Sequence, residues 1–333
     1  MNDQQPLAEA VAVSDGKIIF VGSDEEVKAY LHPGTEQVDL QGRSLLPGFI
    51  DAHGHVSTVG LQAMSANLLP VPDGQVNSVV VLQQVLTEFI SQSDLPAKTG
   101  LVMGFGYDDS QLQELRHPTK TELDLVSTEL PIIIMHQSGH LGVANSKALA
   151  MAGISAATAD PQGGVIRRLQ GSSEPDGVLE ELAFFTVLAK LFPMSDPEFA
   201  MQILQAGQAL YLKYGYTTIQ DGRVSSDQVH TAIRAAEQGL LKADLVSYPD
   251  ITDAKSAALM QPPWFQDSRH TPAYRQHFRI GGMKLTLDGS PQGKTAWLSQ
   301  PYYQPPAGQN ADYAGYAVMT DQQAQTYIEQ ALR

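Results

Sequence analysis

Two histidines, His53 and His55, follow a short apolar segment, FIDA at residues 49–52. Side chains at positions i and i+2 of a β-strand lie on the same face, so both imidazoles can reach one ion at the carboxyl end of such a strand. Neutral imidazole binds zinc and similar divalent ions. The pattern therefore predicts a metal site, and Gly54 between the histidines favours it by allowing a close approach. The alternative is two unrelated polar histidines where a loop begins.

The composition of the 333-residue chain excludes several other functions. With no cysteine, the chain has no disulfide, no thiol nucleophile and no cysteine-based zinc site. The formal net charge of −15 predicts no nucleic-acid partner, because an acidic chain repels phosphate backbones. The sequence contains no run of 18 successive apolar residues, so no membrane span is predicted. The polar first ten residues do not resemble a signal peptide. We therefore expect a cytoplasmic protein.

The first 46 residues are predicted to form a small β unit. Apolar stretches at residues 10–13 and 17–22 flank Ser14, Asp15 and Gly16, which is a pattern typical of a β-hairpin. Two further strand segments are expected at residues 38–40 and 44–46.

From Pro47 onward, predicted strands and helices alternate. This order indicates βαβ units and a parallel sheet, which either closes into a (β/α)₈ barrel or winds into an open sheet. The periodicity leaves that choice open. The strands are expected at residues 49–52 (buried), 101–104, 131–135, 216–219, 244–247 and 283–287, and the helices at 79–91, 142–152, 198–214, 226–238 and 321–333, the last with Thr320 as its N-cap.

Several motifs along the chain resemble the amidohydrolase superfamily. The segment VDLQGRSLL at residues 38–46 running into PGFIDAHGH at 47–55 resembles its opening. The later motifs narrow the resemblance to the YtcJ-like, "amidohydrolase 3" branch, which includes N-substituted formamide deformylase. They are HQSGH (136–140), ANSKAL (144–149), AGI (152–154), DGVLEE (176–181), GYTTIQD (215–221), KLTLDGS (284–290) and TAW (295–297).

The resemblance implies a fold and a domain organisation. It implies an α/β protein with a (β/α)₈ TIM-like barrel and a small β-sandwich built from both chain ends. We expect residues 1–48 to supply part of the sandwich and residues 49–333 part of the barrel, with insertions at about 60–215. Only about four of the eight βα units fit into this sequence, so the barrel is expected to be incomplete, at about its first half.

The resemblance also implies one or two divalent ions, with zinc the expected metal. His53 and His55 match the ligands on the first strand. Lys284 matches a lysine that is carboxylated and bridges two ions in binuclear relatives. The alternative for Lys284 is a surface lysine that extends to solvent, although an unpaired lysine is costly to bury in the apolar run at residues 283–287.

Other polar residues have two possible roles. His140 matches a family histidine that lies near the substrate, and the alternative is a solvated loop histidine. Asp288 is a second candidate for substrate binding. Asp288 and Asp221 follow strands and could face the pocket, but as turn formers both fit a structural cap better. Glu180 is expected at the start of a helix, where its charge would favour the helix dipole.

The predicted function is hydrolysis of a non-peptide, amide-type C–N bond of a small-molecule substrate through a metal-activated water. We assign no catalytic acid or base, because the family's later histidine ligands and its aspartate on the eighth strand do not lie in this sequence. The alternative is a catalytically inactive remnant, or an assembly or binding subunit of the same fold. A half barrel exposes its interior and two sheet edges, so we expect a homo-oligomer or a missing C-terminal half.

Overall fold

The computed structural model describes residues 3–161, 163–191, 196–260, 263–265, 274–291, 294–305 and 309–331. The chain forms two compact units, Met1–Pro47 and Gly48–Arg333. None of the helices in the described ranges combines the length and the apolar character that crossing a bilayer requires.

The first unit contains the predicted hairpin. Strand β1 (Ala10–Ser14) pairs antiparallel with β2 (Lys17–Gly22), and Asp15 and Gly16 adopt the positive φ angles of a tight turn. A short 3₁₀ helix, η1 (Glu26–Tyr30), follows. The strands predicted at residues 38–40 and 44–46 are wrong: both segments are exposed loop, because no neighbouring strand in the described residues offers them backbone hydrogen bonds.

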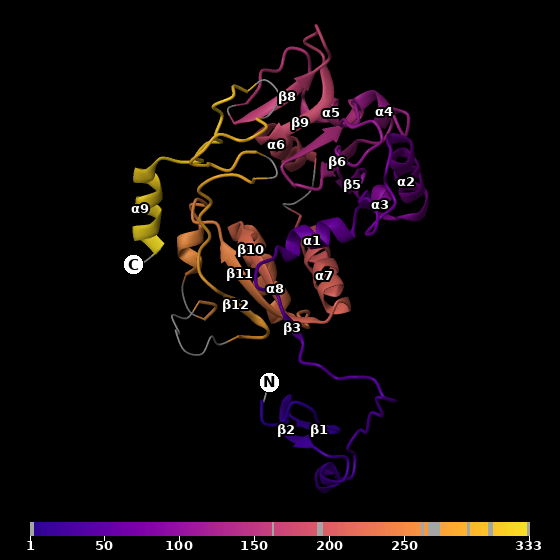
Figure 1. Cartoon of the computed structure of the whole chain (residues 1–333), viewed down its shortest axis with the longest axis vertical. Helices are drawn as coiled ribbons and strands as arrows, with labels where there is room; N and C mark the ends of the chain where they lie inside the picture. The colour runs from indigo at the N-terminus through magenta and orange to yellow at the C-terminus, as the bar shows by residue number, and fades with distance from the viewer. Residues whose placement is uncertain are drawn as a thin grey trace. The chain divides into compact units, whose positions relative to one another are not determined.

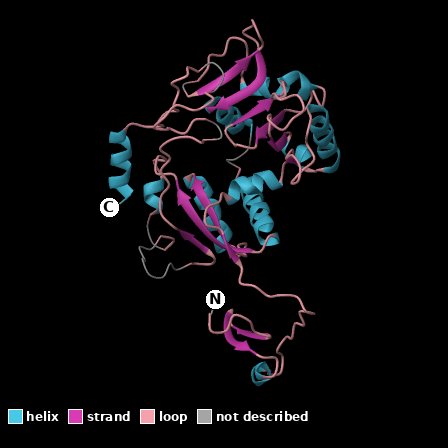
Figure 2. Ribbon diagram, viewed as in Figure 1, coloured by secondary structure: helices cyan, strands magenta, loops and turns pink. Residues whose placement is uncertain are grey.

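The second unit contains a parallel sheet of four strands in the order β12-β11-β10-β3 (Figure 1). The strands are β3 (Phe49–Ile50), β10 (Tyr216–Val224), β11 (Asp244–Pro249) and β12 (Phe278–Ile280). Helices α7 (Pro197–Lys213) and α8 (Ser226–Glu237) lie beside this sheet (Figure 2). Apolar side chains from both helices share one core with β10, β11 and β12.

Two predictions for this sheet need correction. Residues 283–287 do not form the expected strand, because within them only Lys284 pairs with a neighbouring segment, through an isolated bridge with Asp250. The fourth strand of the sheet, β12, lies a few residues earlier. The strand expected to be buried at residues 49–52 is the exposed two-residue edge strand β3. Phe49 and Ile50 are 53% and 72% exposed, because nothing in the described residues covers that side of the sheet.

A second, six-stranded sheet has the order β4-β5-β6-β7-β9-β8. Strands β4 to β6 run parallel, whereas β6, β7, β9 and β8 pair antiparallel. Its strands are β4 (Ala66–Asn67), β5 (Val102–Tyr107), β6 (Ile132–His136), β7 (Leu141–Ala144), β8 (Gly164–Arg168) and β9 (Pro175–Glu181). The accompanying helices are α2 (Val79–Gln92), α3 (Leu95–Thr99), α4 (Lys120–Asp124), α5 (Ser146–Ala152) and α6 (Leu182–Leu191).

Two predictions for this region were also wrong in part. The helix expected at residues 142–152 is strand β7 followed by helix α5, because Asn145 caps a new helix after the strand. Glu180 lies in strand β9 and forms an ion pair with Arg167, so it does not begin a helix.

Helix α1 (Val56–Ala63) connects the two sheets and packs on α7. It follows β3 directly, so its position determines where the chain around His55 lies. At the other end of the unit, α9 (Asp321–Ala331) confirms the last predicted helix, and Thr320 Oγ1 accepts a hydrogen bond from the backbone N–H of Gln323. The predicted residues 332–333 of that helix lie outside the described residues.

Candidate metal centre

His53 and His55 lie in the turn that follows β3. Their ring centroids are 5.3 Å apart and the two rings are nearly perpendicular. Asp51 Oδ1 accepts a hydrogen bond from the backbone N–H of His53, 3.2 Å away, which holds the turn. The i, i+2 spacing thus brings two imidazoles together beyond the carboxyl end of a strand of the parallel sheet.

The end of strand β10 fixes this turn from the other side. The backbone N–H of Gly222 donates to the carbonyl oxygen of Gly54 at 2.7 Å, and His55 forms a backbone bridge with Asp221. A Cβ on Gly222 would lie 3.1 Å from Cε1 of His53 and 3.3 Å from Cε1 of His55. Both rings therefore converge over a residue whose missing side chain leaves room for them.

Asp221 anchors the first turn of α1 to β10. Its Oδ2 accepts hydrogen bonds from Ser57 Oγ at 2.5 Å and from the Ser57 backbone N–H at 3.3 Å. The carboxyl group is buried, and burial raises its pKa to about 7, although both bonds to Ser57 act in the opposite direction. This is the structural cap predicted for Asp221, and it fixes the helix that begins after His55.

The raised pKa of Asp221 predicts a pH-dependent stability. A folded-state pKa above the unfolded value of about 3.9 stabilises the fold at low pH, and this stabilisation is lost as the pH rises through about 7. From pH 5 to pH 8, the metal-free protein should lose about 2–3 kcal/mol of unfolding free energy relative to Asp221→Asn, which cannot ionise. Urea denaturation of both proteins measures the difference, and parallel pH profiles would contradict it.

Lys284 is half-buried and its backbone is paired with the segment after β11. Its N–H donates to the carbonyl oxygen of Pro249 at 2.8 Å, and its carbonyl accepts from the Ile251 N–H at 3.0 Å. Burial, then the charges of His53 and Lys284, lower the pKa of His55. Lys284 therefore lies within electrostatic reach of His55, and the His55 ring is held neutral, which is the form that binds a metal ion.

His140 follows β6, in the loop before β7. Its Nδ1 lies 3.1 Å from Oε2 of Glu181, and this contact raises the pKa of His140. Glu181 adopts a φ of 47°, a strained value for a residue with a side chain, and its N–H donates to the carbonyl oxygen of His140. The sequence motifs predict a role for His140 but do not indicate its partner, because 41 residues separate the two in sequence.

Asp288 is not joined to these residues by any contact in the described part of the chain. Its Oδ2 accepts a hydrogen bond from the Trp297 N–H at 3.0 Å, and its backbone forms a bridge with Ala317. These contacts fit the structural cap that was the preferred interpretation. The substrate-binding role stays a prediction.

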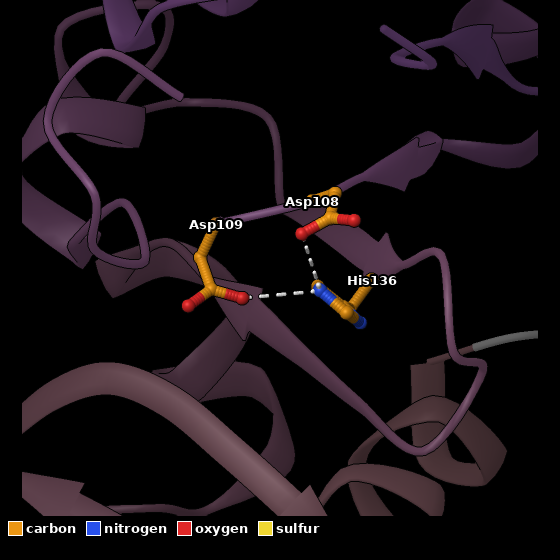
Figure 3. A group of neighbouring side chains, drawn as sticks. All are labelled: Asp108, Asp109 and His136. Atoms are coloured by element: carbon orange, nitrogen blue, oxygen red, sulfur yellow. Dashed lines mark ion pairs between the residues drawn. The ribbon is translucent and has the colours of Figure 1, made fainter. Parts of the chain in front are cut away.

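A second polar group, which the sequence reasoning missed, lies at the ends of β5 and β6. Figure 3 shows Asp108 and Asp109 facing His136. One ligand atom from each residue lies within 4.8 Å of the others, so the group could hold a metal ion. The sequence contains a pattern that could have indicated this group. Asp108 and Asp109 follow one apolar segment and His136 ends another, and these segments form the parallel neighbours β5 and β6.

The hydrogen bonds of His136 Nδ1 favour a cluster without a metal ion, although the buried Nε2 makes no hydrogen bond within the described residues. Nδ1 accepts from the Ser138 N–H at 3.1 Å, so the proton of the neutral ring is on Nε2. Nε2 lies 3.2 Å from Asp109 Oδ1 and 3.7 Å from Asp108 Oδ1, and the facing imidazole keeps the pKa of Asp109 below its ordinary value. A metal ion would have to displace that proton. The network instead fixes the start of the loop that carries His140.

His117 and Tyr107 extend this network. The Tyr107 hydroxyl lies 3.1 Å from His117 Nδ1, and burial lowers the pKa of His117 to about 4. The His117 ring is therefore neutral at physiological pH, and its hydrogen bond to a fully buried tyrosine gives it a structural role.

The fold resembles that of two solved structures of metal-dependent hydrolases. A solved structure of an uncharacterized metal-dependent hydrolase from Pyrococcus horikoshii OT3 matches 97% of this chain and 58% of its own, with a TM-score of 0.64 and 22% sequence identity. A second, from Pyrococcus furiosus, matches with a TM-score of 0.63 and 20% identity, over 97% of this chain and 60% of its own.

Sequence comparison identifies the family. Residues 36–332 match the model of the amidohydrolase family, and the chain belongs to that family. The exoenzymes regulatory protein AepA of Pectobacterium carotovorum subsp. carotovorum is 31% identical over 310 residues, which cover 91% of this chain and 64% of that protein. N-substituted formamide deformylase of Arthrobacter pascens is 34% identical over 236 residues, 70% of this chain and 42% of that protein. The chain thus spans less than two thirds of the length of these relatives.

Proposed function

We propose that the protein belongs to a metal-dependent hydrolase that cleaves a non-peptide, amide-type C–N bond of a small molecule. The observation that carries the proposal is the convergence of His53 and His55 over Gly222, with Lys284 within electrostatic reach. Membership of the amidohydrolase family supports it. The amide-type bond is supported by the relative named N-substituted formamide deformylase.

His53 and His55 are two ligands suited to a divalent ion, with zinc as the proposed metal, whereas the described cluster of three ligand residues lies at Asp108, Asp109 and His136. The two imidazoles would supply nitrogen ligands, and Lys284, if carboxylated, would supply an anionic oxygen donor. When bound there, a divalent ion polarises a carbonyl group and acidifies water. The chain's own contribution is to orient both rings through the bonds of Asp51 to His53 and of Gly222 to Gly54. His140, paired with Glu181, is proposed to contact the substrate.

We further propose that the parallel sheet is part of a (β/α)₈ barrel. Across the sheet, the strands β3, β10, β11 and β12 lie side by side in the order in which they occur along the chain, as successive barrel strands do. Both outer strands then need partners, and the exposed Phe49 and Ile50 of β3 are apolar residues that such a partner would cover. A C-terminal half of the same protein, or a second copy of the chain, would supply these strands.

The metal site is tested by zinc content. His53→Ala and His55→Ala should each weaken zinc binding at least about 100-fold, because removal of a ligand should exceed the 10–100-fold effect of its supporting contacts. Zinc is measured by elemental analysis after loading and dialysis. His230→Ala, which removes an exposed histidine of α8, is the matched control and should keep the zinc content of the unchanged chain.

Two outcomes would contradict the assignment. Asp109→Asn should leave zinc binding intact, and loss of zinc in that variant alone would place the centre at Asp108, Asp109 and His136. A folded chain, judged by circular dichroism, that binds no zinc after loading would favour the alternative of an inactive remnant or an assembly subunit.

A further inference from the structure

Arg223, at the end of β10, is held in a defined orientation by a buried carboxylate. Its Nε donates to Oδ2 of Asp250 at 2.6 Å. Oδ1 of Asp250 accepts from the backbone N–H and the hydroxyl of Thr252, so the carboxylate itself is fixed. The side chain of Asp250 is only 12% exposed, whereas that of Arg223 is 53% exposed. The arginine is thus anchored at its inner nitrogen and open to solvent beyond it.

The outer nitrogens of this guanidinium are available to a ligand. Neither Nη1 nor Nη2 makes a hydrogen bond with any residue that the structure describes. A guanidinium has five donors in a rigid plane, and one Nε bond to Asp250 uses one of them. The remaining planar pair matches the two oxygens of a carboxylate, which arginine binds in a bidentate manner.

Arg223 is flanked by the residues of the candidate metal centre. It follows Gly222, over which the His53 and His55 rings converge. Its anchor, Asp250, forms a backbone bridge with Lys284. The positive charge of Arg223 acts to lower the pKa of both His55 and His140. The backbone of Arg223 thus adjoins the candidate metal centre, and its charge acts on His55 and on His140.

A purely structural role of Arg223 explains its pairing with Asp250 less well than ligand binding does. Half-exposed ion pairs contribute little to stability, and Asp250 already has two bonds to Thr252 that position it. The chain carries a net charge of −15, and the open guanidinium of Arg223 is a positive charge beside the candidate centre. Such a charge attracts an anionic ligand.

We propose that Arg223 binds a carboxylate of the substrate, so that the substrates are amide-type compounds bearing a carboxylate close to the scissile bond, such as N-acylated amino acids. This inference rests on the proposed function, because it names the substrate class of the same site. In this arrangement Arg223 determines specificity, while Asp250 orients it and keeps the Nη pair facing the ligand.

The test compares two ligands that differ only in charge, N-acetylglycine and N-acetylglycinamide. Dissociation constants are measured by NMR titration of the labelled, metal-free chain, so that no metal ion can bind the carboxylate. The unchanged chain should bind N-acetylglycine at least about 10-fold more tightly than the amide, as expected for a charge-assisted hydrogen-bonded pair. Arg223→Gln should remove this preference.

Two further variants make the result specific. Arg234→Gln removes an arginine of α8 that donates to the Pro197 carbonyl oxygen, and it should keep the full preference. Arg223→Lys keeps a positive charge beside Asp250 and loses only the planar fork. It should lose most of the preference, and it decides the question if Arg223→Gln does not fold.

The outcomes separate this inference from the hydrolase proposal. Equal affinity for the two ligands in the unchanged chain, no binding of either, or an unchanged preference in Arg223→Lys would overturn the inference. None of these results affects zinc binding by His53 and His55. Conversely, a carboxylate preference that depends on Arg223, in a chain that binds no zinc, would keep the anion site and remove the hydrolase assignment.

Discussion

Replacing Gly60 by valine should destabilise the second unit by about 4 kcal/mol or more, because the crossing of α1 and α7 has no room for a side chain. A Cβ on Gly60 would lie 1.9 Å from the carbonyl oxygen of Ile203, and one on Gly207 would lie 2.2 Å from the carbonyl oxygen of Val56. The two helices thus touch backbone to backbone, and only a shift of one helix could relieve the overlap.

The same change should disturb the candidate metal centre. Helix α1 begins at Val56, directly after His55, and Ser57 in its first turn is bonded to Asp221. A displaced α1 would therefore pull His55 away from Gly222. We expect any Gly60→Val protein that still folds to bind zinc more weakly than the unchanged chain, although residue 60 is not itself a proposed ligand.

Chemical denaturation followed by circular dichroism measures the stability loss. Thr58→Ala is the control, because it changes an exposed position of the same helix and should alter the unfolding free energy by no more than about 0.5 kcal/mol. A Gly60→Val protein as stable as the Thr58→Ala protein would show that the helices cross differently from the described packing.

The parts of the fold that local signals determine were predictable from the sequence. Helix α8 begins where Ser225 and Gln228 form a capping box, and α2 begins at Ser78, whose hydroxyl accepts from the Val81 N–H. These caps depend on residues three positions apart, so one sequence contains all the information. The position of His53 and His55 after a strand followed from the same kind of short-range pattern.

The errors arose where pairing between distant segments decides the structure. Residues 142–144 have an apolar pattern that suits a helix, but their pairing with β6 and β9 makes them a strand. Strand β12 lies at Phe278–Ile280 because its register with β11 places it there. Sheet pairing of this kind depends on side-chain and backbone partners that a single segment does not contain.

In the candidate site, too, short-range patterns were predictable from the sequence, whereas contacts between distant residues were not. The i, i+2 histidines were visible in one motif, whereas the bond from Arg223 to Asp250 joins residues 27 positions apart, and the bond from Ser57 to Asp221 spans 164 positions. Both pairs depend on the adjacency of β10 with β11 and β3 in the parallel sheet. Residues that support or flank the centre therefore became recognisable only with the sheet order.

Replacing Asn145 by alanine should cost about 4 kcal/mol or more, because this side chain is fully buried and makes four hydrogen bonds. Its Oδ1 accepts from the N–H groups of Ile132 and Ala148, at 3.0 and 2.9 Å. Its Nδ2 donates to the carbonyl oxygens of Ser127 and Leu130, at 2.8 and 3.0 Å. Alanine would leave two buried N–H groups and two part-buried carbonyl oxygens without these partners, and the unfolding free energy measures the loss.

Asn67→Ala is the matched control for this second variant. Asn67 also makes two kinds of hydrogen bond, accepting from the Leu69 N–H and donating to the Asp73 carbonyl oxygen, but it is exposed, so water can replace the lost partners. The same change there should cost about 1 kcal/mol. Equal losses in the two variants would contradict the prediction. A larger loss at Asn145 would show that one buried amide holds β6 and α5 together, and with them the loop that carries His140.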